Sequence, residues 1–197
     1  MGTEYTLYCE ARIGGKWHNI DFYQRPIGRD LMISPVIWGK SAIGAALNWY
    51  TIPTRIRKDD ISQVTRAAES DKSDDWQWQY IPGSWFIDKD LDAPEFCGYF
   101  PRQEVLDYKA GLTDLICTDD MLDTEAYLAL PDDGKIAYQY FEYTEEWGAR
   151  HVTQMIKHAV ECRIRAANDW LWSIPKEERG DTDSIGWSDV RLIVYTS

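Results

Sequence analysis

The chain has 197 residues, of which 33 are acidic and 21 are basic, so its net charge is −12 with histidine neutral. Hydrophobic residues make up 44% of the chain and aromatic residues 14%, which excludes a disordered acidic tail. No apolar stretch approaches the ~18–20 residues that a membrane-spanning helix needs. A pI near 4.6 argues against a protein that binds the phosphate backbone of nucleic acids through a basic face. We therefore expect an ordered, soluble, acidic protein without a membrane or direct nucleic-acid partner.

The N-terminal residues predict a β-hairpin. Residues 4–13 alternate in character and are rich in tyrosine, threonine and leucine, which is typical of a strand. Gly14-Gly15 is a strong two-residue hairpin turn, so residues 17–23 are expected to return as the second strand. A third strand is predicted over residues 31–38, where Pro35 favours an edge position or a break.

The middle of the chain carries weaker signals, which come from helix caps, prolines and short alternations. The expected elements are, in order, a helix over 42–50 capped by Ser41, a helix from Asp59 or Asp60 to about Glu69, a polar loop over 70–75, a strand from Trp76 to Tyr80, a turn at Pro82-Gly83, a strand over 84–87, a helix over 101–109, a helix over 119–130 and a turn over 132–134. Most of the helices are therefore expected between the two ends of the chain.

The clearest element is a long amphipathic helix near the C-terminal end. Apolar residues recur every three or four positions from Val152 to the residue before Pro175, where the helix is expected to end. Thr144 is the candidate N-cap. An apolar strand follows over residues 190–195, and its composition predicts an inner position in a sheet.

Strands at both chain ends with helices between them predict an α+β fold. We expect a small mixed or antiparallel sheet, formed by the N-terminal hairpin and the C-terminal strand, packed with several helices. The length favours one domain over residues 1–197, with a smaller lobe at about 70–135. No basic stretch followed by an apolar one opens the chain, and the four cysteines are dispersed, so we expect a cytoplasmic protein with reduced thiols.

His158 and Cys162 are the best candidate metal ligands. They lie four residues apart on the predicted long helix, so both side chains leave the same face and can bind one ion. Cys97 and Cys117 would complete a Cys₃His set, which is a closed tetrahedral zinc site, and His151 is the alternative fourth ligand. The other interpretation is that Cys162 is a small buried apolar residue and that His158 lies at the edge of the core.

Negative charge is concentrated in residues 104–146. This window contains twelve acidic and two basic residues, so it carries −10 of the net −12. Such a density attracts cationic partners and speeds association, although self-repulsion destabilises the chain. Ordinary solubility is the alternative explanation. The carboxylates predicted to bind a basic surface of a partner are Asp114, Asp119, Asp120, Asp123, Glu125, Asp132, Asp133 and Glu142.

The sequence contains no GxSxG, GxxxxGK[ST] or GxGxxG motif. A binding protein is therefore the first hypothesis. The alternatives are a metal-dependent hydrolase that uses the clustered carboxylates and a zinc-stapled structural or assembly protein. Arg55, Arg57 and Lys58 form the one dense basic cluster, which can contact a phosphate group or remain solvated.

In general character the chain resembles the small, acidic, aromatic-rich accessory proteins of phages and mobile elements, including anti-CRISPR proteins that block a Cas nuclease. The resemblance lies in the acidic composition and in the 10 tryptophans and 12 tyrosines; it covers no motif and assigns no residue a role. It implies a non-catalytic inhibitor that binds a basic channel or lobe of a large nuclease and prevents nucleic acid from loading. In some such inhibitors a bound zinc ion supports the fold.

Overall fold

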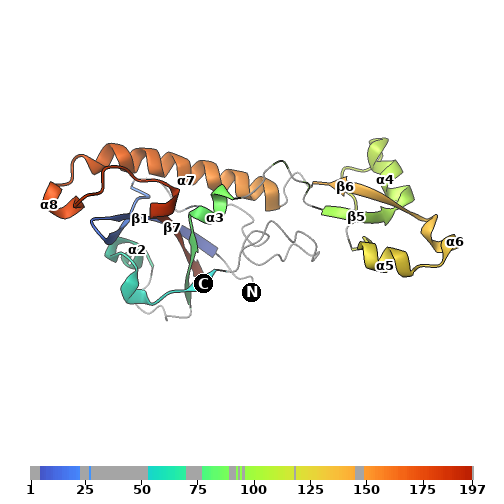
Figure 1. Ribbon diagram of the computed structural model, residues 1–197, viewed down its shortest axis with the longest axis horizontal. Helices are drawn as coiled ribbons and strands as arrows, with labels where there is room; N and C mark the ends of the chain where they lie inside the picture. The colour runs from blue at the N-terminus through green and yellow to red at the C-terminus, as the bar shows by residue number, and fades with distance from the viewer. Residues whose placement is uncertain are drawn as a thin grey trace.

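The computed structural model describes residues 5–22, 27, 53–69, 77–88, 92, 94, 96–117, 119–144 and 149–196. Its main elements in chain order are β1 (Tyr5–Ile13), β2 (Lys16–Asn19), β3 (Thr54–Arg55), α2 (Gln63–Ala67), β4 (Trp78–Pro82), α3 (Ser84–Ile87), β5 (Phe96–Pro101), α4 (Arg102–Lys109), α5 (Thr124–Ala129), α6 (Asp132–Lys135), β6 (Tyr138–Tyr143), α7 (Ala149–Leu171), α8 (Lys176–Arg179) and β7 (Val190–Thr196). The strands form two antiparallel sheets, one with the order β2-β1-β7-β4-β3 and one consisting of β5 and β6. The predicted α+β fold is confirmed (Figure 1).

The C-terminal strand β7 lies at the centre of the five-stranded sheet, as the sequence predicts. It pairs antiparallel with β1 on one side, from Tyr5↔Thr196 to Ala11↔Val190, and with β4 on the other. Six of its seven residues are buried. The chain ends are thus joined through one ladder, which is the pairing expected between the N-terminal hairpin and the last strand.

The hairpin between β1 and β2 uses the predicted glycine turn. Gly14 and Gly15 have φ angles of +57° and +79°, a conformation that both central residues of a type I′ turn require. The second strand is shorter than predicted, since it ends at Asn19. The Asn19 side chain accepts a hydrogen bond from the Asp21 N–H at 3.0 Å, and this local turn takes the chain out of the ladder.

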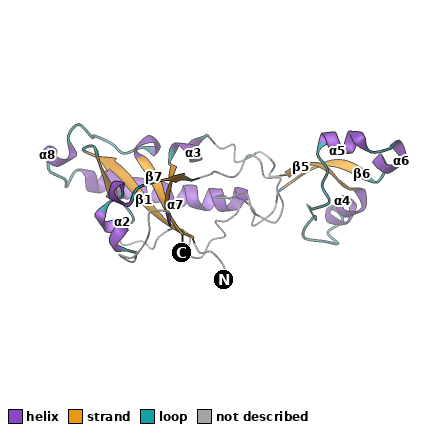
Figure 2. Ribbon diagram, turned by 90° about the horizontal axis from the view of Figure 1, so that it is seen from below, coloured by secondary structure: helices purple, strands orange, loops and turns teal. Residues whose placement is uncertain are grey.

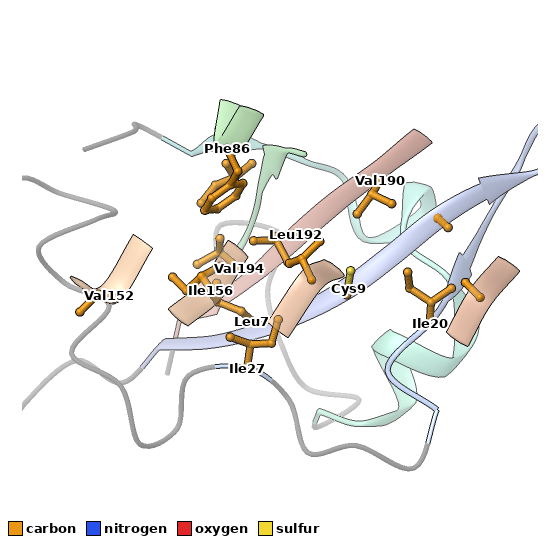
Figure 3. Close-up of a cluster of buried hydrophobic side chains, with 14 of the residues drawn as sticks. Leu7, Cys9, Ile20, Ile27, Phe86, Val152, Ile156, Val190, Leu192 and Val194 are labelled. Atoms are coloured by element: carbon orange, nitrogen blue, oxygen red, sulfur yellow. The ribbon is translucent and has the colours of Figure 1, made fainter. Parts of the chain in front are cut away.

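The long helix α7 covers one face of the five-stranded sheet. Figure 3 shows Ile156 of this helix beside Leu7 of β1 and Val194 of β7, with Val152 farther to the left; all four belong to the main hydrophobic core. The three- and four-residue spacing of the apolar residues gives the helix one continuous stripe, which the sheet buries. The helix ends at Leu171, three residues before the predicted end at Ile174. The chain there tightens into turns in which the Ser173 N–H bonds the Trp170 carbonyl and the Ile174 N–H bonds the Leu171 carbonyl.

A second, smaller core occupies the opposite face of the sheet. Successive strand residues point to opposite sides, so Tyr8 and Ile193, the neighbours of Leu7 and Leu192, pack there with Trp78. Aromatic rings pack against each other in this core; those of Trp78 and Tyr195, for example, have centroids 4.8 Å apart. Both faces of the sheet are therefore covered.

Two predictions in the middle of the chain are wrong. Residues 84–87 form the short helix α3, not a strand, and they begin with a turn in which the Phe86 N–H bonds the Gly83 carbonyl at 3.0 Å. Asp59 and Asp60 do not cap a helix, since they lie in a 3₁₀ turn over Lys58–Asp60. The cap of α2 is Ser62, whose hydroxyl accepts the Thr65 N–H at 3.3 Å.

The segment over 119–134 is also corrected. The helix predicted from Asp119 begins only at Thr124, because Asp123 is its cap and accepts the Ala126 N–H at 2.7 Å. The predicted turn over 132–134 is the start of the single-turn helix α6. Strands β5 and β6 are additional to the predicted elements.

The strand predicted over 31–38, the helix over 42–50 and the loop over 70–75 lie outside the described residues. These predictions stay untested, as does the single domain over residues 1–197. Thr144 is described and precedes α7, which begins at Ala149, whereas residues 145–148 between them are not described. Within the part of the chain that the structure describes, no helix combines the length and apolarity needed to cross a membrane.

Replacing Gly14 with alanine is expected to destabilise the protein more than the same change at Gly15. Both glycines have positive φ, which costs alanine about 1–2 kcal/mol. A Cβ on Gly14 would lie 1.9 Å from the Glu178 carbonyl oxygen, whereas a Cβ on Gly15 would meet nothing within 4 Å. The overlap adds roughly 1–3 kcal/mol of strain. Urea denaturation of the two variants measures the difference; equal losses would mean that the contact with Glu178 is unimportant.

Candidate functional site

The predicted acidic residues gather on one part of the molecule, which we call the acidic lobe and define as residues 96–144. Figures 1 and 2 show the β5–β6 pair in the middle of this lobe, with α4 on one side and α5 on the other. Phe96, Phe100 and Tyr143 are buried between the strands and α4. The ring of Tyr108 on α4 lies edge-on to that of Tyr143, with centroids 5.4 Å apart. These aromatic contacts pack α4 against the β5–β6 pair.

Helix α5 is held against the other side of the strands by a stacked pair of tyrosines. The rings of Tyr99 on β5 and Tyr127 on α5 are nearly parallel, with an interplanar angle of 3° and centroids 3.6 Å apart. Just before α5, Leu122 and Tyr99 exchange two backbone hydrogen bonds of 2.9 Å. The acidic turns around α5 are therefore anchored to the sheet, which fixes where their carboxylates point.

The charge of the lobe is strongly negative. It contains ten acidic and three basic residues, a net charge of −7, which exceeds half of the charge of the whole chain. All eight carboxylates predicted to bind a partner are exposed, and all belong to this lobe, namely Asp114, Asp119, Asp120, Asp123, Glu125, Asp132, Asp133 and Glu142. The acidic stretch of the sequence therefore forms an exposed, negatively charged surface on this lobe.

Few of these carboxylates form an ion pair with another described residue. Asp132 forms an ion pair with Lys135 at 3.2 Å, and the exposure of that pair makes it worth little. In contrast, Asp114, Asp119, Asp120 and Glu125 have no ion-pair partner among the described residues. Their charge is therefore available to a cationic surface from outside.

The lobe also exposes large apolar side chains, which sequence reasoning missed. Six of them are between 46% and 74% exposed, namely Leu106, Leu112, Leu115, Leu128, Ile136 and Tyr140. Single exposed apolar residues are ordinary, but several on one small unit are typical of a contact surface. A usable sequence signal was the pair Val105-Leu106 on α4, since only one of two successive helical residues can face the core.

The proposed zinc ligands are only partly brought together. Cys162 Sγ and His158 Nε2 are 3.8 Å apart on α7, as their spacing predicts. Cys97 and Cys117 are both exposed on the acidic lobe. Among the described residues, no three His, Cys, Asp or Glu side chains are grouped closely enough to hold a metal ion. The Cys₃His set and the alternative with His151 stay predictions.

Elemental analysis of protein purified without added metal tests the zinc site directly. A closed tetrahedral site retains its ion through purification. Less than about 0.2 zinc per chain would exclude a structural zinc ion. About one zinc per chain, lost in the variant Cys162→Ala, would instead establish the site and show that its ligands move together.

The arrangement of the carboxylates bears on the hydrolase alternative. Two pockets among the described residues are lined by side chains of β1, β2, β3, β4 and β7, the turn before α2 and the segment around α8, and none of their lining residues belongs to the acidic lobe. The eight predicted carboxylates instead lie exposed in loops, on the short helices α5 and α6 and on strand β6. Such an arrangement suits contact with a surface better than the enclosure of a substrate.

Comparison with known proteins found no matching family model, no similar curated protein and no similar solved structure. The function therefore has to follow from the chain's own residues.

Proposed function

We propose that this protein is a non-catalytic inhibitor that binds another protein through its acidic lobe. The partner presents a basic nucleic-acid-binding surface, as a Cas nuclease does, and the bound lobe prevents nucleic acid from loading. Binding takes place in the cytoplasm, where such a partner works. The observation that carries the proposal is a net charge of −7 on one small lobe, with four carboxylates that have no ion-pair partner among the described residues.

Charge of this kind favours a protein partner with a basic groove. A groove that holds nucleic acid is lined with lysine and arginine, whose role is to neutralise phosphates. Exposed carboxylates carry negative charge, as the phosphate groups of nucleic acid do, and like them they face solvent before binding. Complementary fields speed encounter and reject acidic surfaces, so the lobe gains both rate and specificity.

Apolar side chains among the carboxylates supply binding affinity that the charges alone do not. Exposed ion pairs contribute little to the free energy of an interaction, whereas burial of apolar surface is the dominant favourable term in most protein–protein association. Leu112, Leu128 and Ile136 are each more than 60% exposed on the acidic lobe. We propose that such side chains become buried against the partner while the carboxylates surround them.

The experiment is capture of the partner followed by competition. The tagged protein is used to capture proteins from a lysate of the host that carries it, and the captured partner is identified by mass spectrometry. The partner's binding to labelled nucleic acid is then measured by fluorescence anisotropy with increasing amounts of this protein. We expect nucleic acid to be displaced at one equivalent of inhibitor, and displacement to weaken as salt is raised from 0.05 to 0.5 M (~14 to 4 Å Debye length). A partner that binds both at once would overturn the proposal.

A further inference from the structure

A groove in the body of the protein has no part in the proposed function. It lies beside the sheet face opposite α7, has a volume of about 610 Å³, and belongs to β2, β3, β4, β7 and the turn before α2. The lining residues that matter for its chemistry are Lys16, Trp17, Arg55, Arg57, Tyr80 and Arg191. Four of these six are cationic and two are aromatic, in a protein that is acidic overall.

Arg191 forms a fixed inner wall of the groove. Its Nε and Nη2 donate to Glu10 Oε2 at 3.0 and 2.7 Å, and Nη2 also donates to the Asp60 carbonyl. The ion pair with the fully buried Glu10 neutralises this guanidinium. The guanidinium lies over the ring of Trp17, 4.0 Å from its centroid. Arg191 therefore holds the indole in place and leaves recognition of an anion to the other cations.

The rim of the groove carries cations that are available to a ligand. Lys16 and Arg55 are exposed and have no ion-pair partner among the described residues. Arg57 is 3.9 Å from the Asp59 carboxylate, and both side chains are about 80% exposed. An ion pair this long and this exposed contributes little, so an incoming phosphate can replace the carboxylate. Three positive groups thus surround one opening.

The aromatic side chains supply planar surfaces at the same opening. Trp17 and Tyr80 are both partly buried, so each is held in position while some of its ring remains accessible. Nucleobases stack on tryptophan and tyrosine rings, and such stacking is sequence-tolerant because every base has a π-face. Cations beside aromatic planes match a ligand that joins a planar ring to phosphate groups.

We propose that this groove binds a nucleoside phosphate, with the base stacked on Trp17 or Tyr80 and the phosphates bound by Lys16, Arg55 and Arg57. The volume of about 610 Å³ lies within the range of roughly 300–1,000 Å³ that is typical of small-ligand sites. A free nucleotide fits better than a long strand, because the basic rim is short and the groove is also lined by Asp59 and Asp60. This site is independent of the acidic lobe.

Isothermal titration with adenosine diphosphate tests the site on the full chain. We expect one ligand per chain, and binding weakened about tenfold or more by the double variant Arg55→Ala/Arg57→Ala, because hydrogen bonds to charged groups are lost. Both residues are exposed, so the fold should survive, as circular dichroism would show. The matched control is Arg165→Ala/Lys176→Ala, which removes the same charge from exposed positions outside the groove and should bind normally.

Three further ligands separate the chemical contributions. Adenosine and inorganic pyrophosphate should each bind more weakly than adenosine diphosphate, since each lacks half of the recognised groups. If pyrophosphate binds as tightly as the nucleotide, the aromatic residues play no part and the proposal is wrong. If a single-stranded oligonucleotide of about ten bases binds tightly while adenosine diphosphate does not, the ligand is a strand, and the free-nucleotide proposal is overturned. Absence of binding by all four probes overturns it as well.

Discussion

A variant carrying Asp114→Lys, Asp119→Lys, Asp120→Lys and Glu125→Lys is expected to bind the captured partner about a hundredfold more weakly or worse, because like charges that face each other across an interface cost several kcal/mol. The four carboxylates are exposed and have no ion-pair partner among the described residues. Their replacement should therefore leave the fold intact. Surface plasmon resonance at 0.15 M salt measures the affinity, and the association rate should lose most of its dependence on salt.

The matched control reverses the same number of charges away from the acidic lobe. Asp169→Lys, Glu177→Lys, Glu178→Lys and Asp181→Lys change exposed acidic residues on α7 and around α8. Both variants have a net charge of −4, since each of the four reversals adds two charges to −12. We expect the control to bind within about threefold of the original protein. Equal losses in both variants would mean that net charge alone matters, and unchanged binding by the lobe variant would refute the proposed function.

Asp123 and Asp132 are left unchanged in this design because the structure gives them other roles. Asp123 caps α5 through the Ala126 N–H at 2.7 Å, and loss of such a cap costs about 1 kcal/mol. Asp132 pairs with Lys135. From the sequence alone the six carboxylates between 119 and 133 look equivalent. Local hydrogen bonds and ion pairs distinguish the carboxylates whose charge can be reversed without loss of stability from those that support a helix.

The parts of the fold that could be predicted are those specified by short-range patterns. The Gly14-Gly15 turn and the apolar spacing along α7 each depend on residues within a few positions of one another. The β5–β6 pair was missed because its strands are separated by the 36 residues between Pro101 and Tyr138 and recognise each other only through packing. Runs of neighbouring aromatic residues at 96–100 and 138–143 show no simple alternation, since both faces of each strand carry rings.

The candidate surface was predictable in its charge but not in its apolar part. Acidic side chains are nearly always exposed, so a dense run of them predicts a charged surface whatever the fold. Leu112 and Leu115 have the same composition signal as core leucines, yet they lie in the loop after α4 and are 74% and 63% exposed. The zinc hypothesis was also predictable only in part. Helical spacing brings His158 close to Cys162, but it does not predict where cysteines remote in the sequence lie.

Replacing Arg163 with methionine is expected to destabilise the protein by about 3–5 kcal/mol at pH 7, because it leaves a buried carboxylate without its cation. Arg163 Nε donates to Asp21 Oδ1 at 2.5 Å, and the two side chains are only 4% and 6% exposed. Asp21 also accepts hydrogen bonds from the Cys9 N–H and the Asn19 amide. The pair joins α7 to the segment after β2. Urea denaturation measures the free energy of unfolding.

The pH dependence of this loss follows from the carboxyl group. Burial raises the pKa of Asp21 above its usual 3.8, although Arg163 opposes the shift. The folded state therefore binds the proton more tightly than the unfolded state does, so the contribution of Asp21 to stability is full below pH 3.8 and falls as pH rises through the folded pKa. Without Arg163 that pKa rises further. The deficit of Arg163→Met relative to the original protein should thus shrink as pH is lowered from 7 toward 4.

The double variant Arg163→Met/Asp21→Asn separates loss of the ion pair from loss of packing. A neutral amide needs no cation, so the second change should restore part of the stability lost in Arg163→Met. It should also abolish the loss of stability that Arg163→Met shows as pH rises from 4 to 7, since residue 21 no longer titrates. If the double variant is instead less stable than Arg163→Met at pH 7, the buried charge is not the cause, and the arginine stabilises the fold through its other contacts, such as the 3.0 Å hydrogen bond within α7 from Nη1 to the Ala159 carbonyl. The sign of that one comparison decides whether the unpaired buried carboxylate or the lost contacts of the arginine account for the instability.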